Sequence, residues 1–291
     1  MLKLVLPKGS LERATLELFR DADLGVERSS DVDYRATVDD PRISDVRILR
    51  PQEIARYVSE GLFDIGITGR DWIEESSAHV VSLGRLEYSK QTSRPINVVL
   101  AIPSDSPIRS AKEMGNGVRI STEYPNLTRR YFEAQGIDVE IVFSYGATEA
   151  KVPEIADAVV EITETGRALR AAGLRILDTL LVSYTEFIAN PQSYEDLTKR
   201  HAMEQVLSLL HGTLSARSRV LVKLNVGESD LRAVIEALPS MKSPTISQLY
   251  GGSGFAVEAV VPRARINTLI PSLRDLGASD ILEIPLSKIV P

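Results

Sequence analysis

Short apolar segments alternate with amphipathic helical ones from the start of the chain, and this order constrains the fold more than any other feature. LKLVLP at residues 2–7 precedes a helical pattern over residues 10–22, and FDIGIT at residues 63–68 precedes a second helix that opens near Arg70. Strands that alternate with helices in this way are typical of a parallel sheet. We therefore predict an α/β protein.

A second series of strands occupies the middle of the chain. It consists of four apolar segments separated by helical stretches, at residues 96–103, 117–122, 139–144 and 157–163. A further strand at residues 180–188 is expected to return to the first lobe before a long helix over residues 193–214. We therefore expect two lobes, one formed by residues 1–94 with 180–214 and the other by residues 95–179.

The pattern changes after residue 215. A strand at residues 220–226 is followed by a helix with one apolar stripe, formed by Leu231, Val234, Ile235 and Leu238. Two strands then flank the turn GGSG, and a second helix and a last strand follow. The order βαββαβ is that of a ferredoxin-like unit, so residues 215–291 are expected to form a regulatory or assembly domain.

Cysteine is absent from all 291 residues. Its absence excludes disulfides, zinc–thiolate sites and thiol nucleophiles, and it fits a reducing compartment. The N-terminal MLKLVLPKG turns too soon for the hydrophobic region of a signal peptide, and no later run approaches the length of a membrane span. We expect a soluble, cytoplasmic protein that does not associate with membranes.

The charge distribution and the spacing of the histidines bear on two further classes of function, nucleic-acid binding and metal binding. The net charge of −6 arises from 34 basic residues interspersed with 40 acidic ones, without a basic stripe or tail, so nucleic-acid binding is not expected. The three histidines, His79, His201 and His211, have no spacing that metal sites favour. No metal-binding side chain is assigned.

The stretch ADAVVEITETGRAL, at residues 156–169, combines two acids with a phosphate-binding pattern. Strand residues alternate between faces, so Asp157 and Glu161 are expected to share a face with Thr163. The turn that follows opens a helix and presents backbone N–H groups to an anion, with residues Thr165, Gly166, Arg167 and Ala168. The pair of acids and the turn suit a phosphorylated sugar; the alternative is that both acids face solvent at the edge of the sheet.

A similar turn follows the strand at residues 63–68. Thr68 and Gly69 precede a helix that carries Asp71 in its first turn, and ligands of open α/β sheets bind outside the carboxyl ends of the strands. Other residues that follow strand ends are expected at the same cleft: Lys8, Gly9, Arg50, Tyr124 and Glu149. The alternatives are surface charge for Lys8 and Arg50, a helix-start acid for Asp71 and Glu149, and packing for Tyr124.

Six motifs occur in one order along the chain: PKGSL, LRPQEI, FDIGITGRD, TEYPNL, GATEA and DAVVEITETGRAL. In this order they resemble the ATP phosphoribosyltransferase family, which catalyses the first step of histidine biosynthesis. The C-terminal segments VLVKLNV, SPTISQL and LGASDILEIPLSKIV resemble the regulatory domain of the long form of that family. The resemblance implies a bilobal core like that of periplasmic binding proteins, followed by the ferredoxin-like domain.

The resemblance also implies a reaction in which N1 of ATP displaces pyrophosphate from C1 of phosphoribosyl pyrophosphate, with Mg²⁺ carried by the substrate phosphates. Asp157 and Glu161 would face the ribose hydroxyls. The residues expected at the 5-phosphate are Thr163, Thr165, Gly166, Arg167 and Ala168. Those expected along the cleft, against pyrophosphate and nucleotide, are Lys8, Gly9, Arg50, Thr68, Gly69, Asp71, Tyr124 and Glu149.

Members of the family form homohexamers in equilibrium with dimers and are inhibited by histidine bound between C-terminal domains. The resemblance places the histidine contacts at Ser243, Thr245, Asn225 and Ala278. Three positions depart from the family pattern: Ala168 stands where a hydroxyl residue is usual, Glu161 replaces aspartate and Ser10 replaces arginine. Two other functions remain open, that of a bilobal solute-binding protein and that of an amino-acid-sensing regulator.

Overall fold

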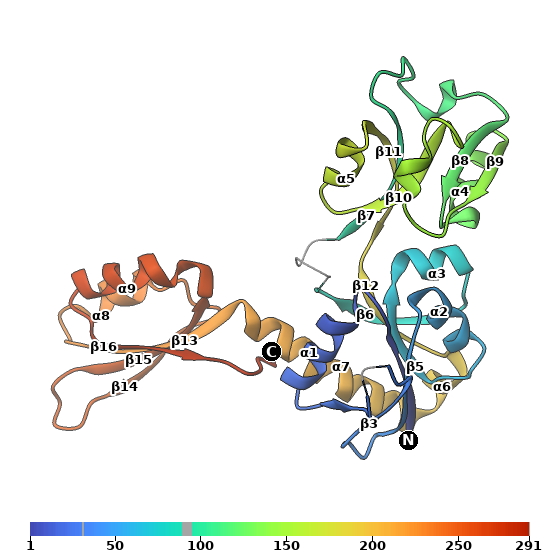
Figure 1. Cartoon of the computed structure of the whole chain (residues 1–291). Coiled ribbons are helices and arrows are strands. Elements are labelled where there is room, and N and C mark those ends of the chain that lie inside the picture. The colour runs from blue at the N-terminus through green and yellow to red at the C-terminus, as the bar shows by residue number, and fades with distance from the viewer. Residues whose placement is uncertain (31, 89–94, 291) are drawn as a thin grey trace. The chain divides into compact units, whose positions relative to one another are not determined.

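The protein, seen here as a computed structural model, is described at residues 1–30, 32–88 and 95–290 (Figure 1). The predicted limits of the first lobe and of the C-terminal domain include residues 89–94 and 291, which lie outside the described residues. The chain divides into two compact units. The larger consists of residues 1–17 and 24–207, and the smaller of residues 18–23 and the chain from Ser208 onward.

A seven-stranded sheet forms one half of the larger unit, with the order β2-β3-β4-β1-β5-β12-β6. Its strands are β1 (Leu2–Pro7), β2 (Val26–Glu27), β3 (Arg35–Val38), β4 (Ile43–Leu49), β5 (Ile65–Gly69), β6 (Val81–Leu86) and β12 (Thr185–Ala189). β1 lies parallel to β4 and β5, and β12 runs antiparallel to β5 and β6. We call this sheet with α2 (Pro51–Ser59) and α3 (Arg70–Ser76) lobe I.

Lobe I is held by a core between the sheet and its helices. Val5 and Ile188 of the sheet pack with Ile54 and Val58 of α2 and with Ile73 of α3. The strands β1 and β5 are almost wholly buried, as the apolar runs in their sequences predict for a sheet covered on both faces. α1 (Glu12–Asp21) follows β1 and begins within the range expected from the sequence.

A five-stranded sheet with the order β11-β7-β10-β8-β9 forms the other half of the larger unit. Its strands are β7 (Ile96–Pro103), β8 (Val118–Thr122), β9 (Val139–Phe143), β10 (Ala158–Thr163) and β11 (Leu174–Ser183). The helices of this half are α4 (Pro125–Glu133) and α5 (Arg167–Ala171), with the short 3-10 helices η1 (Ala111–Glu113) and η2 (Thr148–Lys151). We call this sheet with its helices lobe II.

Central strand β10 contributes to two cores in lobe II. Val160 belongs to the cluster that contains Phe132 of α4, whereas Val159 belongs to the one that contains Leu169 of α5. This alternation follows from the two-residue period of a strand. It accounts for the continuous apolar run that the sequence shows before Glu161.

The single strand expected at residues 180–188 is in fact two strands in different sheets. β11 ends at Ser183 and pairs with β7 in lobe II, and β12 begins at Thr185 and pairs with β5 in lobe I. Tyr184 is therefore the crossing point between the lobes. The local pattern is β-like throughout, and only long-range pairing shows where one sheet ends and the other begins.

The long helix expected after residue 193 is also divided, into α6 (Pro191–Glu195) and α7 (Leu197–Arg217). The side chain of Asn190 caps α6 by accepting a hydrogen bond from the N–H of Ser193 at 2.9 Å. Asp196 accepts from the N–H groups of Thr198 and Lys199 at the start of α7. Each of the two helices therefore begins at a capping side chain, and the break between them lies at Asp196.

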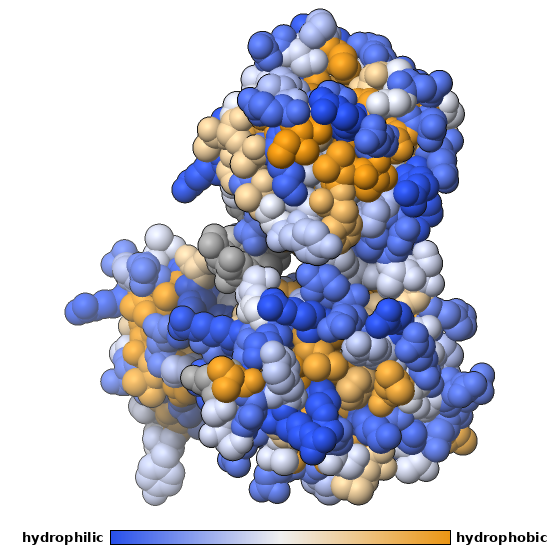
Figure 2. Space-filling model, turned by 45° about the vertical axis from the view of Figure 1, so that its right-hand side comes forward, coloured by the Kyte–Doolittle hydropathy of each residue, from blue (hydrophilic) through white to orange (hydrophobic). Residues whose placement is uncertain are grey.

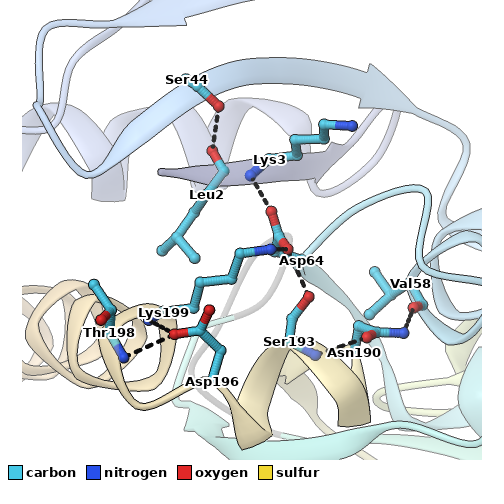
Figure 3. A network of polar contacts seen from close by, with 10 residues as sticks. All are labelled: Leu2, Lys3, Ser44, Val58, Asp64, Asn190, Ser193, Asp196, Thr198 and Lys199. Carbon is cyan, nitrogen blue, oxygen red and sulfur yellow. Dashed lines mark hydrogen bonds and ion pairs between the residues drawn. The ribbon is translucent and has the colours of Figure 1, made fainter.

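Asp64 ties these helices to the sheet of lobe I (Figure 3). Its carboxylate accepts hydrogen bonds from the N–H of Lys3 at 2.7 Å and from the hydroxyl of Ser193 at 2.6 Å, and it pairs with the ammonium group of Lys199 at 2.8 Å. Burial alone would raise the pKa of Asp64, but these three donors together lower it. Asp64 precedes β5, so this network lies at the amino end of that strand.

The smaller unit contains a four-stranded antiparallel sheet with the order β14-β15-β13-β16. Its elements follow one another as β13 (Arg219–Val226), α8 (Leu231–Ala237), β14 (Thr245–Gln248), β15 (Phe255–Pro262), α9 (Ile266–Asp275) and β16 (Ser279–Pro285). Figure 1 shows both helices on one face of the sheet, and Val234 and Leu273 pack there against strand residues such as Val222. The predicted ferredoxin-like domain is confirmed.

The surface is mixed in polarity. Hydrophilic residues cover most of the face seen in Figure 2, and apolar residues gather in smaller patches, one of them on lobe II at the top. Among the described residues, no helix combines the length and the apolar character needed to span a membrane.

Candidate functional site

A cavity of about 1110 Å³ lies in the larger unit and is lined by residues of both lobes. It lies where strands end: Lys8 follows β1, Gly69 ends β5, Glu123 follows β8 and Thr163 ends β10. Ten residues predicted for the site line it: Lys8, Gly9, Arg50, Gly69, Asp71, Tyr124, Thr163, Thr165, Arg167 and Ala168. The carboxyl ends of strands from two sheets thus form one site, as expected for open α/β folds.

The turn after β10 is shaped by Gly166. Its N–H donates to Thr163 Oγ1 at 2.7 Å, and its φ of 70° lies in the left-handed region. A Cβ at this position would lie 2.8 Å from one guanidinium nitrogen of Arg170. The other terminal nitrogen of the same guanidinium donates to the carbonyl of Thr165. Gly166 does not line the cavity; it fixes the loop that carries Thr165 and Arg167 to its wall.

Asp157 lies outside the cavity, contrary to the placement that we expected. It precedes β10, is exposed, and forms a two-pronged ion pair with Arg119, whose guanidinium lies 2.7 Å from Asp157 Oδ1. The Arg119 guanidinium lowers the pKa of Asp157. Thr163 is the sixth residue after Asp157 along the extended strand, roughly 20 Å away at the rise of a β-strand. No contact with the sugar is therefore assigned to Asp157.

Of the neighbouring acids Glu123 and Glu161, the first lines the cavity and the second, which we predicted for the site, does not. Glu161 is half-buried near the end of β10, and burial raises its pKa. Glu123 lines the cavity directly, and its pKa is raised first by burial and then by the charge of Glu161. We did not predict Glu123, although its position directly after an apolar strand is the same signal that identified Tyr124. Glu149 belongs to η2, faces Glu161 and does not line the cavity.

Lobe I supplies positive charge. Lys8 and Arg50 both line the cavity, and the ammonium group of Lys8 lies 4.2 Å from the ring centroid of Tyr34. Gly9, with a φ of 91°, continues this wall. Thr68 differs from the prediction, because it is fully buried and its hydroxyl donates to the carbonyl of Pro51 at 3.0 Å. It connects β5 to the start of α2 and does not line the cavity.

Asp71 is buried beneath the cavity wall. The hydroxyl of Ser183 donates to Asp71 Oδ1 at 2.6 Å, and the hydroxyl of Tyr124 donates to Asp71 Oδ2 at 2.8 Å. Burial raises the pKa of Asp71, although both hydrogen bonds oppose the rise. A side chain at Gly69 would place its Cβ 2.1 Å from Asp71 Oδ1. Asp71 therefore organises the wall and has little surface left for a substrate.

Tyr124 packs within the protein, which was the alternative to the predicted contact with substrate. Its side chain is 1% exposed, and its ring stacks on that of Trp72 with centroids 4.5 Å apart. Trp72 follows Asp71 on α3, so one helix of lobe I contacts both the ring and the hydroxyl of this lobe II residue. We did not predict this role for Trp72, because nothing local in the sequence pairs it with Tyr124.

A second contact joins the same two helices. The carboxylate of Glu75 on α3 accepts hydrogen bonds from the N–H groups of Asn126 and Leu127, at 3.0 and 2.8 Å, in the first turn of α4. Tyr124, at the N-cap position of α4, provides no side-chain cap. Glu75 thus caps a helix of the other lobe, a role that sequence spacing cannot reveal because capping residues normally belong to their own helix.

The four residues predicted to contact histidine belong to the smaller unit. Ser243 and Thr245 are exposed at edge strand β14, whereas Ala278 is buried just before β16 at the opposite edge. The amide of Asn225 donates to Asp280 Oδ2 at 2.9 Å. Three strand spacings separate β14 from β16, roughly 14 Å, so one copy of the domain does not bring all four residues together.

Comparison with protein families decides the relationship. Residues 50–212 match the model described as ATP phosphoribosyltransferase, and residues 216–288 match the model described as HisG, C-terminal domain. The first match alone covers more than half of the chain. The chain belongs to the ATP phosphoribosyltransferase family. The second match identifies the long form of the family, which carries this C-terminal domain.

Relatives in the ATP phosphoribosyltransferase family align over the full length. The ATP phosphoribosyltransferase of Thermodesulfovibrio yellowstonii is 43% identical over 291 residues, which is 100% of this chain and 99% of the relative. That of Koribacter versatilis is 45% identical over 289 residues, 99% of each chain. Among solved structures, the ATP phosphoribosyl transferase (HisG:HisZ) complex from Thermotoga maritima contains a similar chain, with a TM-score of 0.62, 31% identity and coverage of 72% of this chain and 96% of that one. The predicted transferase family and fold are confirmed.

Proposed function

We propose that this chain joins N1 of ATP to C1 of phosphoribosyl pyrophosphate with release of pyrophosphate. One observation carries the proposal beyond family membership. The loop at residues 163–168 and the basic residues Lys8 and Arg50 line the same cavity. A substrate with a phosphate at one end and a pyrophosphate at the other fits a cavity that has an anion-binding loop in one lobe and cations, Lys8 and Arg50 among them, in the other.

The loop would hold the 5-phosphate of the sugar. Thr163, Thr165 and Arg167 line the cavity there, and Ala168 offers its backbone. α5 spans only five residues, so the loop N–H groups and Arg167 matter more than a helix dipole. The hydroxyl residue usual at position 168 is absent, and the affinity for the 5-phosphate would depend on the remaining donors.

Lys8 and Arg50 would stabilise the leaving pyrophosphate, on which negative charge accumulates as the bond to C1 breaks. Mg²⁺ would arrive bound to the pyrophosphate oxygens and keep several waters. The substrate supplies the anionic ligands of Mg²⁺ in this proposal, and no side chain is assigned to the ion. The remaining catalysis is positioning of the two reactants.

Glu123 and Glu161 would act on the sugar itself. Glu123 lines the cavity, and the two carboxylates are close enough to affect each other's ionisation. Carboxylates near C1 stabilise the positive charge that develops on the ribose as pyrophosphate departs, and they accept hydrogen bonds from ribose hydroxyls. Asp157 has no part in this arrangement, because its carboxylate pairs with Arg119 at the other end of β10.

Incubation with ATP, phosphoribosyl pyrophosphate and Mg²⁺ tests the proposed reaction. We expect phosphoribosyl-ATP to form, and its ultraviolet absorbance measures the amount formed. Added pyrophosphatase should increase the yield of phosphoribosyl-ATP by removing the other product. A control lacking phosphoribosyl pyrophosphate should give no change. Folded protein that forms no adduct even with pyrophosphatase present would exclude this function.

We further propose feedback inhibition by histidine, bound between C-terminal domains of a homohexamer in equilibrium with dimers. The placement of Thr245 and Ala278 at opposite edges of one sheet favours a site completed by a second copy of the domain. Inhibition should be weaker in Thr245→Ala, and sedimentation velocity should show association that histidine promotes.

The absence of cysteine supports a cytoplasmic location for this enzyme.

A further inference from the structure

Three side chains between β9 and β10 have no part in the mechanism above. Ser144 and Thr148 are almost completely buried, with 1% and 0% of their surfaces exposed, and Lys151 is half-buried at the end of η2. The turn that carries them includes Ala147 in the left-handed region, with a φ of 49°. Buried hydroxyl groups beside a lysine, in the surroundings of Glu161, call for a physical explanation.

The three side chains form a chain of hydrogen bonds, and the first of these bonds has a fixed direction. The ammonium group of Lys151 donates to Ser144 Oγ at 2.6 Å, and Ser144 Oγ lies 2.9 Å from Thr148 Oγ1. An ammonium group can only donate, so Ser144 accepts from Lys151 and directs its own proton elsewhere. The contact with Thr148 is shorter than the 3.2 Å contact with the carbonyl of Gly146, which favours donation to Thr148.

The chain ends at Glu161. When Thr148 accepts from Ser144, its own hydroxyl proton is free to point at the Glu161 carboxylate, with which its side chain shares a hydrogen bond that lowers the pKa of Glu161. A hydroxyl that donates to an ionised carboxylate forms a charge-assisted hydrogen bond, which is stronger than a neutral one. The positive charge of Lys151 therefore favours one direction for both hydroxyl groups.

Burial and neighbouring acids disfavour the ionised form of Glu161. Burial is the largest influence on its pKa and raises it, and the carboxylate of Glu149 on η2 raises it further. Glu123 and Tyr124, which follow β8, also face Glu161, and the influence of Glu123 is of the same sign. Lys151 is the cation that opposes these effects at Glu161 and at Glu123. Within residues 1–30, 32–88 and 95–290, its ammonium group forms no ion pair within 4.0 Å, so its charge is not neutralised by direct contact.

We propose that Lys151 is a positioning residue, which acts through Ser144 and Thr148 to hold the Glu161 carboxylate ionised and oriented beside Glu123 at the sugar. The proposal rests on the function proposed above, in which these carboxylates stabilise the ribose as pyrophosphate leaves. Lys151 itself does not line the cavity and need not touch the substrate. Its effect on the reaction is an effect on the charge and direction of a neighbouring acid.

Lys151→Met tests this role, because it removes the ammonium group and keeps much of the side-chain volume. We expect the acidic limb of kcat/KM for phosphoribosyl pyrophosphate to move about one pH unit higher, as loss of a nearby opposite charge raises the pKa of an acid. Lys151→Arg keeps a positive donor and should restore much of the shift. The matched control is Lys112→Met, which makes the same change at an exposed site of lobe II and should leave the profile unchanged.

Thr148→Val tests the hydroxyl chain separately, since it keeps both the lysine and the shape of the buried side chain. It should move the acidic limb in the same direction by a smaller amount. Titration of ¹³C-labelled glutamate carboxyls by NMR, with Glu161 assigned by its loss in Glu161→Gln, should show the same order of pKa values without any need for activity. Thermal unfolding of each variant identifies a loss of folding.

Two results would overturn the inference. One is a folded Lys151→Met protein whose Glu161 titrates as in the wild type. The other is an activity loss that is equal at every pH, which would indicate a purely structural role for the turn. The function proposed above fails in a different way, by the absence of product from the wild-type protein, and the NMR titration remains informative in that case.

Discussion

Asp71 of lobe I and Tyr124 of lobe II are joined by a hydrogen bond of 2.8 Å between carboxylate and phenol, and both side chains are buried. The same tyrosine ring stacks on Trp72. At this contact, beside the substrate cavity, the opposite lobe engages both the ring and the hydroxyl of Tyr124, and Ser183 and Glu75 form further contacts between the lobes. This arrangement explains why Tyr124, which was predicted to bind substrate, instead connects the two lobes.

Tyr124→Phe should destabilise the larger unit while keeping its fold. The variant retains the stacked ring and removes the hydroxyl, which leaves Asp71 Oδ2 without its donor in a buried place. We expect the free energy of unfolding in urea to fall by roughly 1–3 kcal/mol. Tyr145→Phe is the matched control, because Tyr145 is 94% exposed and should change stability little. Equal stability of the two variants would show that the Asp71 hydrogen bond contributes nothing.

The two acids of ADAVVEITETGRAL should now respond differently to mutation. Glu161→Gln removes a charge next to Glu123 and should lower kcat about 100-fold, a typical loss for one group that stabilises charge in a transition state. Asp157→Asn should leave kcat and KM within about two-fold of wild type, because its carboxylate contacts Arg119 far from the cavity. Steady-state kinetics on both variants distinguish the acids, and a large loss in Asp157→Asn would contradict its placement.

Much of the fold follows from local patterns, as β7 and β15 show. β7 begins and ends where the sequence predicts, and β15 begins directly after the turn GGSG, since each is an apolar or alternating run that stops at a proline. The order of strands and helices after residue 215 similarly predicts the ferredoxin-like domain. These features depend on residues within a few positions of one another, which a single sequence displays directly.

The errors in the candidate site concern direction and long-range contact. Alternation predicts that Asp157 and Glu161 share one face, but Asp157 precedes its strand and so lies at the amino end, away from the edge where ligands bind. The partners of Asp71 and Thr68 are Tyr124, Ser183 and Pro51, which only the folded chain brings close. Capping of α4 by Glu75 is hidden from the sequence for the same reason.

Gly166→Ala should weaken binding of phosphoribosyl pyrophosphate. The left-handed φ of 70° disfavours alanine, and the added Cβ would press on Arg170, so the loop carrying Thr165 and Arg167 must move. We expect calorimetry with the Mg²⁺ complex of this substrate to show roughly ten-fold lower affinity, equivalent to about 1.4 kcal/mol. Gly173→Ala is the control, with a similar φ of 74° and no atom near the added Cβ. If both variants bind equally well, the loop is not the phosphate site.

Glu75→Ala should loosen the contact between α3 and α4. It leaves two N–H groups at the start of α4 without their acceptor, and loss of a helix cap typically costs about 1 kcal/mol. Urea unfolding should show that loss, and hydrogen exchange should be faster at Asn126 and Leu127. Glu133→Ala, an exposed change at the other end of α4, should have neither effect. Unchanged exchange at these two amides would exclude the cap.

The pH dependence of stability should reveal the Asp64 network. Lys199, Ser193 and the N–H of Lys3 hold the pKa of Asp64 below its ordinary value despite burial, so the folded protein binds this proton less readily than the unfolded chain. The resulting stability is present above the unfolded pKa of about 3.9 and is lost as pH falls through the lower folded value. Asp64→Asn should therefore cost roughly 3 kcal/mol near pH 7, where it leaves Lys199 without its buried partner, and much less near pH 3. Urea unfolding at both pH values measures the difference, with exposed Asp105→Asn as control. A cost that is the same at both pH values would mean that the shape of the Asp64 side chain, and not its charge, stabilises the junction of β1, β5 and α7.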